Sequence, residues 1–215
     1  MNRMKELILR YYGTTKNKST GSFGAVFWAS IVIVHILFFV VFYYSYNIYM
    51  ADSIEYLMQA YNIKEHLSFY CADLTKEINP ALYTKRPPMY GIIILTIKSI
   101  YNSNYFILFV QNLLSIANIV GLIKILQEHK FEFDVRKSIY VFIVLFPAQY
   151  IYVNMIMSEI LLQTLIFWAM FNLFYYVKNK NPRSILYYNI LLALAVLTKP
   201  VLVYFWIPNL IFMAY

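Results

Sequence analysis

Long apolar stretches alternate with short polar ones along the chain. Residues 25–46 form an uncharged apolar run of about the length that crosses a bilayer as an α-helix. A cleaved signal peptide is disfavoured, because the run is too long for a signal-peptide core and no small-residue cleavage site follows it. Three later runs have the same character and predict further spans: 105–126, 139–157 and 160–177.

Two prolines interrupt the later part of this pattern. Pro147 lies inside the 139–157 run and is expected to bend that helix. Pro200 separates two short apolar runs, 185–198 and 201–215, which form either two spans or one kinked span.

The longest polar segment follows the first apolar run and extends from residue 47 to residue 103. Within it, 89–101 is apolar but too short to span a bilayer, and Lys98 interrupts it, so we expect a helix lying in the interface. The pattern as a whole predicts an all-α fold: a polytopic transmembrane helical bundle of about five to six spans, with juxtamembrane helices in its first loop.

Composition narrows the class of protein. Hydrophobic residues make up 61% of the 215 residues and charged residues 13%, whereas soluble domains have about 45–50% and about 25%. A soluble domain and a disordered chain are therefore excluded. A disulfide scaffold is excluded too, because Cys71 is the single cysteine.

The net charge of +8 is distributed unevenly. The excess of basic over acidic residues falls entirely in alternate polar segments, which is the positive-inside pattern. It predicts a multi-pass plasma membrane protein with a cytoplasmic tail at 1–24 and an extracytoplasmic loop at 47–103, and it needs no nucleic-acid partner. The basic residues of the three cytoplasmic segments are Arg3, Lys5, Arg10, Lys16, Lys18, Lys124, Lys130, Arg136, Lys137, Lys178, Lys180 and Arg183.

Polar groups at the predicted outer surface are the candidates for chemistry. If the segment after residue 50 is helical, Asp52, Glu55, Tyr56 and Gln59 share one face. A purely structural interpretation is equally open, in which Asp52 caps the helix and Glu55 completes a capping box.

A basic pair, Lys85 and Arg86, precedes Pro87 and Pro88. The prolines stiffen the backbone and would hold the guanidinium at the outer interface, where it can grip a phosphate with paired hydrogen bonds. The alternative is an anchor for lipid head groups.

Glu159 directly precedes a span, and Lys199 lies at a helix break near the same side. Glu159 could face Asp52 across a cavity, or act with Ser158 only at the helix terminus. Lys199 could equally extend to the interface. His35 is expected to be a packed core residue, and no histidine has metal-ligand partners at useful spacing.

The order of these features resembles the N-terminal half of the GT-C membrane glycosyltransferases, the group of protein O-mannosyltransferases and aminoarabinose transferases. The resemblance extends from the first span to the end of the chain. It rests on Asp52-Ser53-x-x-Tyr56, Arg86-Pro87-Pro88-Met89-Tyr90, Gln111-Asn112-Leu113, Pro147 upstream of Ser158-Glu159, and Leu197-Thr198-Lys199-Pro200.

The resemblance implies an inverting transferase that moves a sugar from a polyprenyl-phosphate donor to an extracytoplasmic glycan, lipid or protein acceptor. It implies Asp52 as the catalytic base and Glu159 as the second acidic residue of the catalytic site, which positions the acceptor or holds a divalent cation. It places Arg86 near the donor phosphate, with Glu55, Tyr56, Lys85 and Lys199 also on the substrate-binding side. Many relatives carry two adjacent acids where this chain has Asp52-Ser53, so no metal ligands are assigned, and a divalent cation stays an open option.

Two other functions are compatible with the sequence. A non-catalytic transporter or flippase of lipid-linked glycans would also use outer basic residues and apolar spans. An inactive, truncated GT-C remnant would lack the later spans. Because the sequence stops at Tyr215 inside an apolar run, we expect residues 1–215 to be a single transmembrane domain that is an N-terminal fragment.

Overall fold

The structure is a computed structural model that describes residues 24–128 and 133–205, with side chains left out of the description at 127–137 and at 205. Within these ranges the chain is all-α, with eight α-helices and two short 3-10 helices. The predicted cytoplasmic tail up to residue 23 and the last apolar residues, 206–215, lie outside the described residues.

Three described helices are long and apolar enough to cross a membrane: α2 (Ala25–Ser45), α5 (Asn104–Glu128) and α8 (Glu159–Asn179). Two apolar helices are shorter, α4 (Pro88–Ile100) and α9 (Pro182–Thr198). The prediction of a helical membrane protein is supported by these helices. The prediction of five to six spans is not confirmed, because the other apolar helices of the described residues are shorter than these three.

Pro147 divides a predicted span into two helices, α6 (Phe133–Leu145) and α7 (Pro147–Val153). We expected a bend within one helix, whereas the structure has a break. Pro147 is the first residue of α7, the position where its missing N–H costs no helical hydrogen bond. Pro200 acts in the same way, since α9 ends at Thr198 and the 3-10 helix η2 (Pro200–Phe205) begins directly after an extended Lys199.

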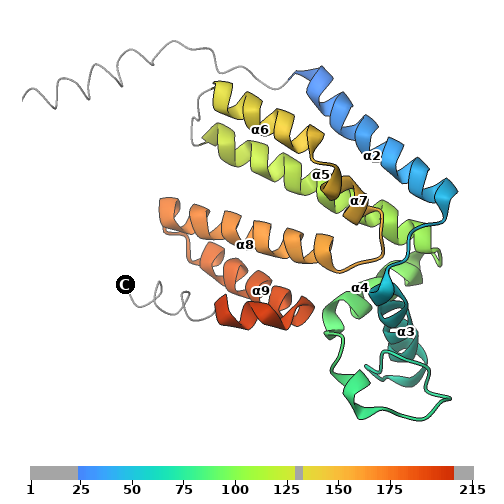
Figure 1. The fold of residues 1–215 in the computed structure, drawn as a ribbon. Helices are drawn as coiled ribbons and strands as arrows, with labels where there is room; N and C mark the ends of the chain where they lie inside the picture. Colours follow the sequence, from blue (N-terminus) through green and yellow to red (C-terminus); the bar gives the residue numbers. More distant parts are fainter. Residues whose placement is uncertain (1–23, 129–132, 206–215) are drawn as a thin grey trace, which may run out of the picture.

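The long helices lie side by side, and the first loop forms a separate layer at one end of them (Figure 1). That loop contains α3 (Ala51–His66), the 3-10 helix η1 (Pro80–Tyr83) and α4. The end of α2 and the starts of α5 and α8 point toward it. The loop predicted to be extracytoplasmic therefore meets the ends of three apolar helices.

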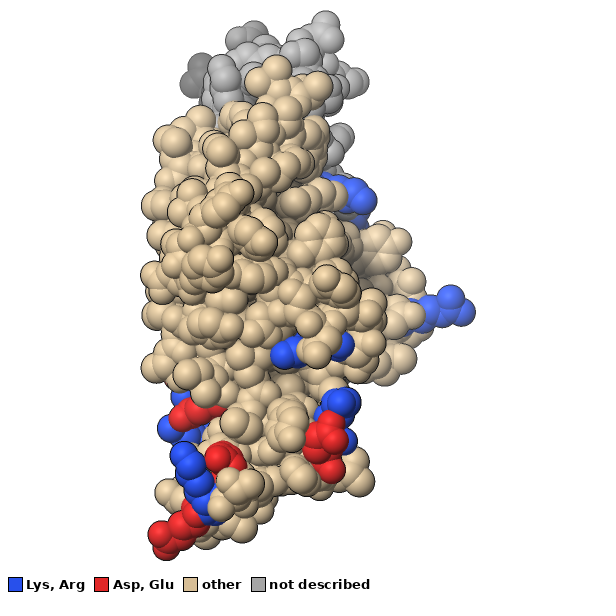
Figure 2. All heavy atoms as spheres, turned by 90° about the vertical axis from the view of Figure 1, so that its right-hand side faces the viewer, with Lys and Arg blue, Asp and Glu red and all other residues tan. Residues whose placement is uncertain are grey.

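A continuous apolar core joins the loop layer to the helices. Ile94 of α4, Ile107 and Leu108 of α5, Ile156 and Ala195 are fully or almost fully buried in it. By contrast, large apolar side chains of α2 such as Val26 and Val41 are exposed. An exposed apolar face of this kind is what a lipid-facing helix requires. On the face that Figure 2 shows, every acidic side chain lies at one end, and the rest is predominantly uncharged.

The packing of α3 against α4 depends on a glycine. Gln59 of α3 is fully buried and donates hydrogen bonds to the carbonyl groups of Phe69 and Arg86, at 3.1 and 2.9 Å. A Cβ atom added at Gly91 of α4 would lie 2.5 Å from Gln59 Oε1. Because Gln59 is held by its two hydrogen bonds, its side chain has little freedom to move aside.

We therefore predict that Gly91→Ala destabilises the protein by about 1–3 kcal/mol. Thermal unfolding in detergent, followed by circular dichroism, measures the effect. Gly24→Ala is the matched control, since a Cβ atom there meets nothing within 4 Å. Equal melting temperatures for wild type and Gly91→Ala would show that the α3–α4 contact is not tight.

Candidate functional site

The side chain that caps the N-terminus of helix α3 is that of Ser53, not that of Asp52. The Ser53 hydroxyl accepts a hydrogen bond from the backbone N–H of Met50 at 2.8 Å and donates one to the carbonyl of Ile156 at 2.7 Å. It thus caps α3 and ties it to the segment that precedes α8. The capping interpretation of Asp52 and Glu55 is wrong, because both residues lie inside α3 with their carboxylates directed to basic side chains. The carboxylates of Asp52 and Glu55 are therefore not used for helix capping and belong to a cluster of charged side chains.

Arg86 joins the acidic residues of α3 to the start of α4. Its Nη1 and Nη2 donate to the two carboxylate oxygens of Asp52 at 2.8 and 2.5 Å, and its Nε donates to Glu55 Oε2 at 2.5 Å. Lys85 Nζ donates to the other oxygen of Glu55, also at 2.5 Å. The paired bonds between Arg86 and Asp52 are the bidentate arrangement that a guanidinium forms with a carboxylate.

The backbone at Arg86 is held as rigidly as the sequence suggested. Pro87 is the N-cap of α4, and Pro88 is its first residue, so the chain direction changes there without an unsatisfied N–H group. The carbonyl of Arg86 accepts the hydrogen bond from Gln59 described above. Gln59 therefore positions Arg86, a role that its place on the polar face of α3 did not reveal.

Tyr56 connects this ion-pair cluster to α8. The guanidinium of Arg86 lies 5.5 Å from the centre of the Tyr56 ring, within the range of a cation–π interaction. The Tyr56 hydroxyl donates to Ser158 Oγ at 3.2 Å. Tyr56 is almost completely buried, so it is a wall of the site and a link between elements.

Glu159 and Lys199 form a second ion pair. Lys199 Nζ donates to Glu159 Oε1 at 2.6 Å, which joins the start of α8 to the break after α9. Glu159 Oε2 is buried without a hydrogen-bond partner among the described residues. Ser158 occupies the N-cap position of α8, but its side chain makes no capping bond, since its hydroxyl binds Tyr56.

Six of the seven predicted site residues thus lie in two ion-pair clusters at one end of the apolar helices, and the seventh, Tyr56, lies between them. The first cluster is Asp52, Glu55, Lys85 and Arg86, and the second is Glu159 and Lys199. Asp52 and Glu159, which the sequence predicted to face one another across a cavity, share no ion-pair partner among the described residues. Each has its own basic partner, and the Tyr56–Ser158 bond joins the clusters.

Two residues that the sequence motifs contain, but to which no role was assigned, support this arrangement. Tyr90 of α4 donates from its hydroxyl to Gln111 Oε1 at 3.1 Å, and Gln111 Nε2 donates to the carbonyl of Met155 at 3.0 Å. Gln111 thereby fixes α4 and the segment before Ser158 to α5. The motifs named Tyr90 and Gln111 but could not show that they bond to one another, because their partners come from segments far apart in the chain.

Electrostatics make the first cluster sensitive to acid. Burial raises the pKa of Glu55, but hydrogen bonds and charge from Lys85 and Arg86 outweigh burial and bring the pKa below its ordinary value of 4.5. For Arg86, partial burial opposes the charged form, yet Glu55 and Asp52 raise its pKa further. Glu55 and Arg86 each keep their partner in the charged form at neutral pH.

Metal binding has no support in the described part of the chain. Among residues 24–128 and 133–205, no group of three or more histidine, cysteine, aspartate or glutamate side chains is placed to hold a metal ion. The possible divalent cation of the sequence analysis thus has no ligand set here, and the charges at the site are balanced by lysine and arginine.

Comparisons with known proteins give no match: no family model, no curated protein and no solved structure is similar to this chain.

We predict that acid weakens the packing of α3 through Glu55. A carboxylate with a lowered pKa stabilises the folded state above its ordinary pKa of 4.5, and this contribution is lost as the pH falls through the lower, folded value. The melting temperature of wild type should therefore fall more steeply below pH 4.5 than that of Glu55→Gln. Glu77→Gln, an exposed acid in the same loop, serves as control and should follow wild type. Parallel curves for wild type and Glu55→Gln would contradict the prediction.

Proposed function

We propose that the protein is a membrane glycosyltransferase of the GT-C type, which moves a sugar from a polyprenyl-phosphate donor to a glycan, lipid or protein acceptor on the extracytoplasmic side of the plasma membrane. The observation that carries the proposal is the ion-pair cluster of Asp52, Glu55, Lys85 and Arg86. It combines a candidate base with a rigidly held guanidinium where the loop layer meets the apolar helices.

Arg86 has capacity for a phosphate. A guanidinium has five N–H groups, and three of them are used by Asp52 and Glu55. The two acids and two bases of the first cluster balance, and so do Glu159 and Lys199. An incoming phosphate is therefore not repelled by a net negative site, but it competes with Asp52 for the guanidinium.

This competition couples donor binding to the activity of the base. Both carboxylate oxygens of Asp52 accept hydrogen bonds from Arg86, so both are occupied by the guanidinium and not directed at an acceptor. When the donor phosphate draws Arg86 toward itself, the Asp52 carboxylate is released next to the anomeric carbon. The base then becomes effective only when there is a sugar to transfer.

The reaction itself is a single substitution. Asp52 accepts the proton of the acceptor hydroxyl or amine as its oxygen or nitrogen forms a bond to the anomeric carbon. The bond between that carbon and the phosphate oxygen breaks, and the electron pair leaves with the polyprenyl phosphate. Arg86 and Lys85 stabilise the charge that develops on the leaving phosphate. Attack opposite the leaving group inverts the anomeric centre.

Glu159 and Lys199 complete the site on the α8 side. Glu159 Oε2 has no hydrogen-bond partner among the described residues. After a small shift of the side chain, an acceptor hydroxyl can donate a hydrogen bond to it. Lys199 orients the carboxylate through its 2.6 Å bond to Oε1. We assign Glu159 to acceptor positioning and Lys199 to holding Glu159.

The position of the charges favours an enzyme over a transporter. Transporters place their polar sites near the bilayer midplane, on interrupted helices. Here Asp52 and Glu55 belong to α3, and Arg86 lies directly before α4, so all three belong to the loop layer. The acidic side chains on the face shown in Figure 2 also gather at that end of the molecule. A surface site of this kind suits a transfer between a lipid-anchored donor and an acceptor outside the bilayer.

The test is sugar transfer in isolated membranes, measured as release of polyprenyl phosphate from a labelled polyprenyl-phosphate sugar. We predict that Asp52→Asn lowers the rate by about a hundredfold or more, because loss of a general base costs at least that much. Asp73→Asn is the matched control, since Asp73 lies in the same loop and bonds only to Thr75 nearby.

At equal protein level, Asp73→Asn should release polyprenyl phosphate at the wild-type rate. Transfer by Asp52→Asn at the wild-type rate would show that Asp52 is not the base. Absence of release by wild type across polyprenyl-phosphate sugars would contradict the proposed function.

A further inference from the structure

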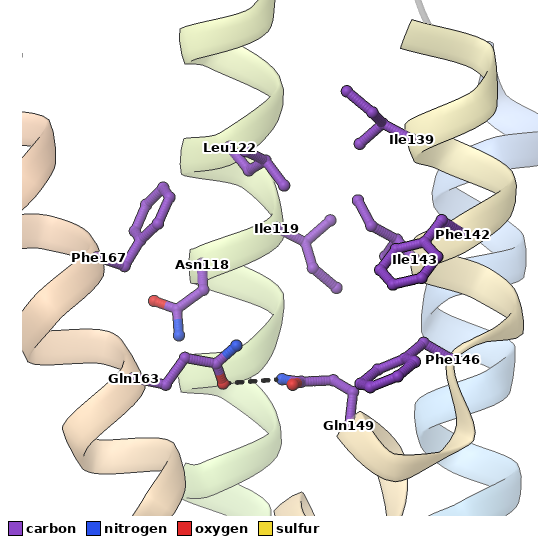
Figure 3. Close-up of a pocket in the computed structure, with 10 residues that line it drawn as sticks. All are labelled: Asn118, Ile119, Leu122, Ile139, Phe142, Ile143, Phe146, Gln149, Gln163 and Phe167. Atoms are coloured by element: carbon purple, nitrogen blue, oxygen red, sulfur yellow. Dashed lines mark hydrogen bonds between the residues drawn. The ribbon is translucent and has the colours of Figure 1, made fainter. Parts of the chain in front are cut away.

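A pocket of about 390 Å³ lies between α5, α6, α7 and α8 (Figure 3). Its volume falls in the range of small-molecule sites in proteins. The upper wall in the figure is apolar and the lower end is formed by three amide side chains. The lining residues are Asn118, Ile119, Leu122, Ile139, Phe142, Ile143, Phe146, Gln149, Gln163 and Phe167.

The amide end of the pocket is ordered by hydrogen bonds to its surroundings. Gln149 Nε2 donates to Ser115 Oγ at 2.9 Å and to Gln163 Oε1 at 3.2 Å. Ser115 in turn binds Nε2 of the buried His35 at 3.0 Å. His35 is thus a packed core residue, as expected, and it supports the pocket from behind.

Two polar groups at the amide end of the pocket have no hydrogen-bond partner among the described residues: the amide nitrogen of Gln163 and the amide oxygen of Asn118. Gln163 is exposed and its carbonyl oxygen binds Gln149, so its amide nitrogen remains as a donor. Asn118 is 6% exposed, and its Nδ2 donates to Thr164 Oγ1 at 2.9 Å. Because Thr164 donates its own proton to the carbonyl of Ile160, the Asn118 amide cannot be turned over, and its Oδ1 stays without a partner.

An unpartnered amide oxygen costs about 1–3 kcal/mol in a protein interior, and in hydrocarbon there is no bulk water to compensate for it. Two of the helices around the pocket, α5 and α8, are long and apolar enough to span a membrane. A ligand that brings both a donor and an acceptor to this end would satisfy Asn118 and Gln163 together. A hydroxyl group has both functions.

The lining also limits the charge of the ligand. None of the ten lining residues is ionisable, and an ionised head group buried there would lack a counter-ion. A lipid phosphate is therefore disfavoured, and this pocket is distinct from the place of Arg86. The apolar wall suits a hydrocarbon chain.

We propose that the pocket binds a neutral lipid alcohol, with its hydroxyl at Asn118 and Gln163 and its hydrocarbon chain along Ile119, Phe142 and Phe167. The Asn118 oxygen is covered in the unliganded structure, so the hydroxyl reaches it by displacing part of the pocket wall. This inference is independent of the proposed transferase activity, since it involves none of the charged residues of that site.

The experiment is photo-crosslinking of the purified protein in nanodiscs with two probes, a long-chain alcohol carrying a diazirine and the alkane analogue of equal length. The alcohol should label peptides of α5, α6 and α8 that line the pocket, and free long-chain alcohol should compete. The alkane should label the pocket about fivefold to tenfold less, the difference expected from one or two hydrogen bonds.

Variants separate a bound ligand from annular lipid. Gln163→Leu changes an exposed side chain and should reduce alcohol labelling to the level of the alkane. Asn172→Leu, on the same helix and bonded within it to Trp168, should label like wild type. Ile139→Trp fills the pocket from its apolar wall and should reduce labelling by both probes.

Equal labelling by alcohol and alkane, or labelling spread evenly over the outer helix faces, would overturn the proposal and leave a water-filled pocket. Unchanged alcohol labelling in Gln163→Leu would overturn it as well. The labelling requires no sugar transfer, so its failure and the failure of the proposed function can be distinguished.

Discussion

The loop layer is held together by the hydrogen bonds that the guanidinium of Arg86 donates to two carboxylates of α3. It binds Asp52 and Glu55 of α3 at once, while its backbone is fixed by Pro87, Pro88 and the amide of Gln59. Removal of this one side chain would leave two carboxylates close together without their shared partner, which is costly in a partly buried site. A lysine has a single charged nitrogen and cannot reproduce three directed bonds.

The remainder of the site is arranged around that constraint. Ser53 and Tyr56, on the face of α3 that meets the helices, bond to Ile156 and Ser158 before α8. Gln111 then ties the same region to α5 and α4. The polar groups are thus held by side chains from four segments, as a site that must keep its geometry beside a fluid bilayer requires.

Much of this could be predicted from the sequence, because apolar length and charge act locally. The span-like runs at α2, α5 and α8 gave helices with nearly the expected bounds, and the short run before Tyr101 gave α4. The number of spans could not be settled in this way, since Pro147 ends one helix and begins another where we expected a bend. A proline in an apolar run is compatible with either outcome, and tertiary packing decides between them.

The candidate site residues could be found from the sequence because charged residues are rare in this chain. Which of them pair with one another could not be found in this way. From the sequence, Glu159 was expected either to face Asp52 across a cavity or to act only at its helix terminus, and Arg86 was expected near a phosphate. The structure pairs Asp52 with Arg86 and Glu159 with Lys199. Pairing across 34 and 40 residues depends on how helices pack, which local patterns do not contain. The role of Ser53 in capping α3 and binding the carbonyl of Ile156 could not be predicted either, since serine is common in the first turn of a helix.

The pairing of Asp52 with Arg86 leads to the central claim of the account, that a lipid phosphate and Asp52 compete for the same guanidinium. The most direct measurement is the affinity of polyprenyl phosphate for purified protein in nanodiscs, with free polyprenol as reference. Asp52→Asn should bind the phosphate several-fold more tightly than wild type, because it removes the competing negative charge. Weaker or unchanged binding by Asp52→Asn would contradict the account.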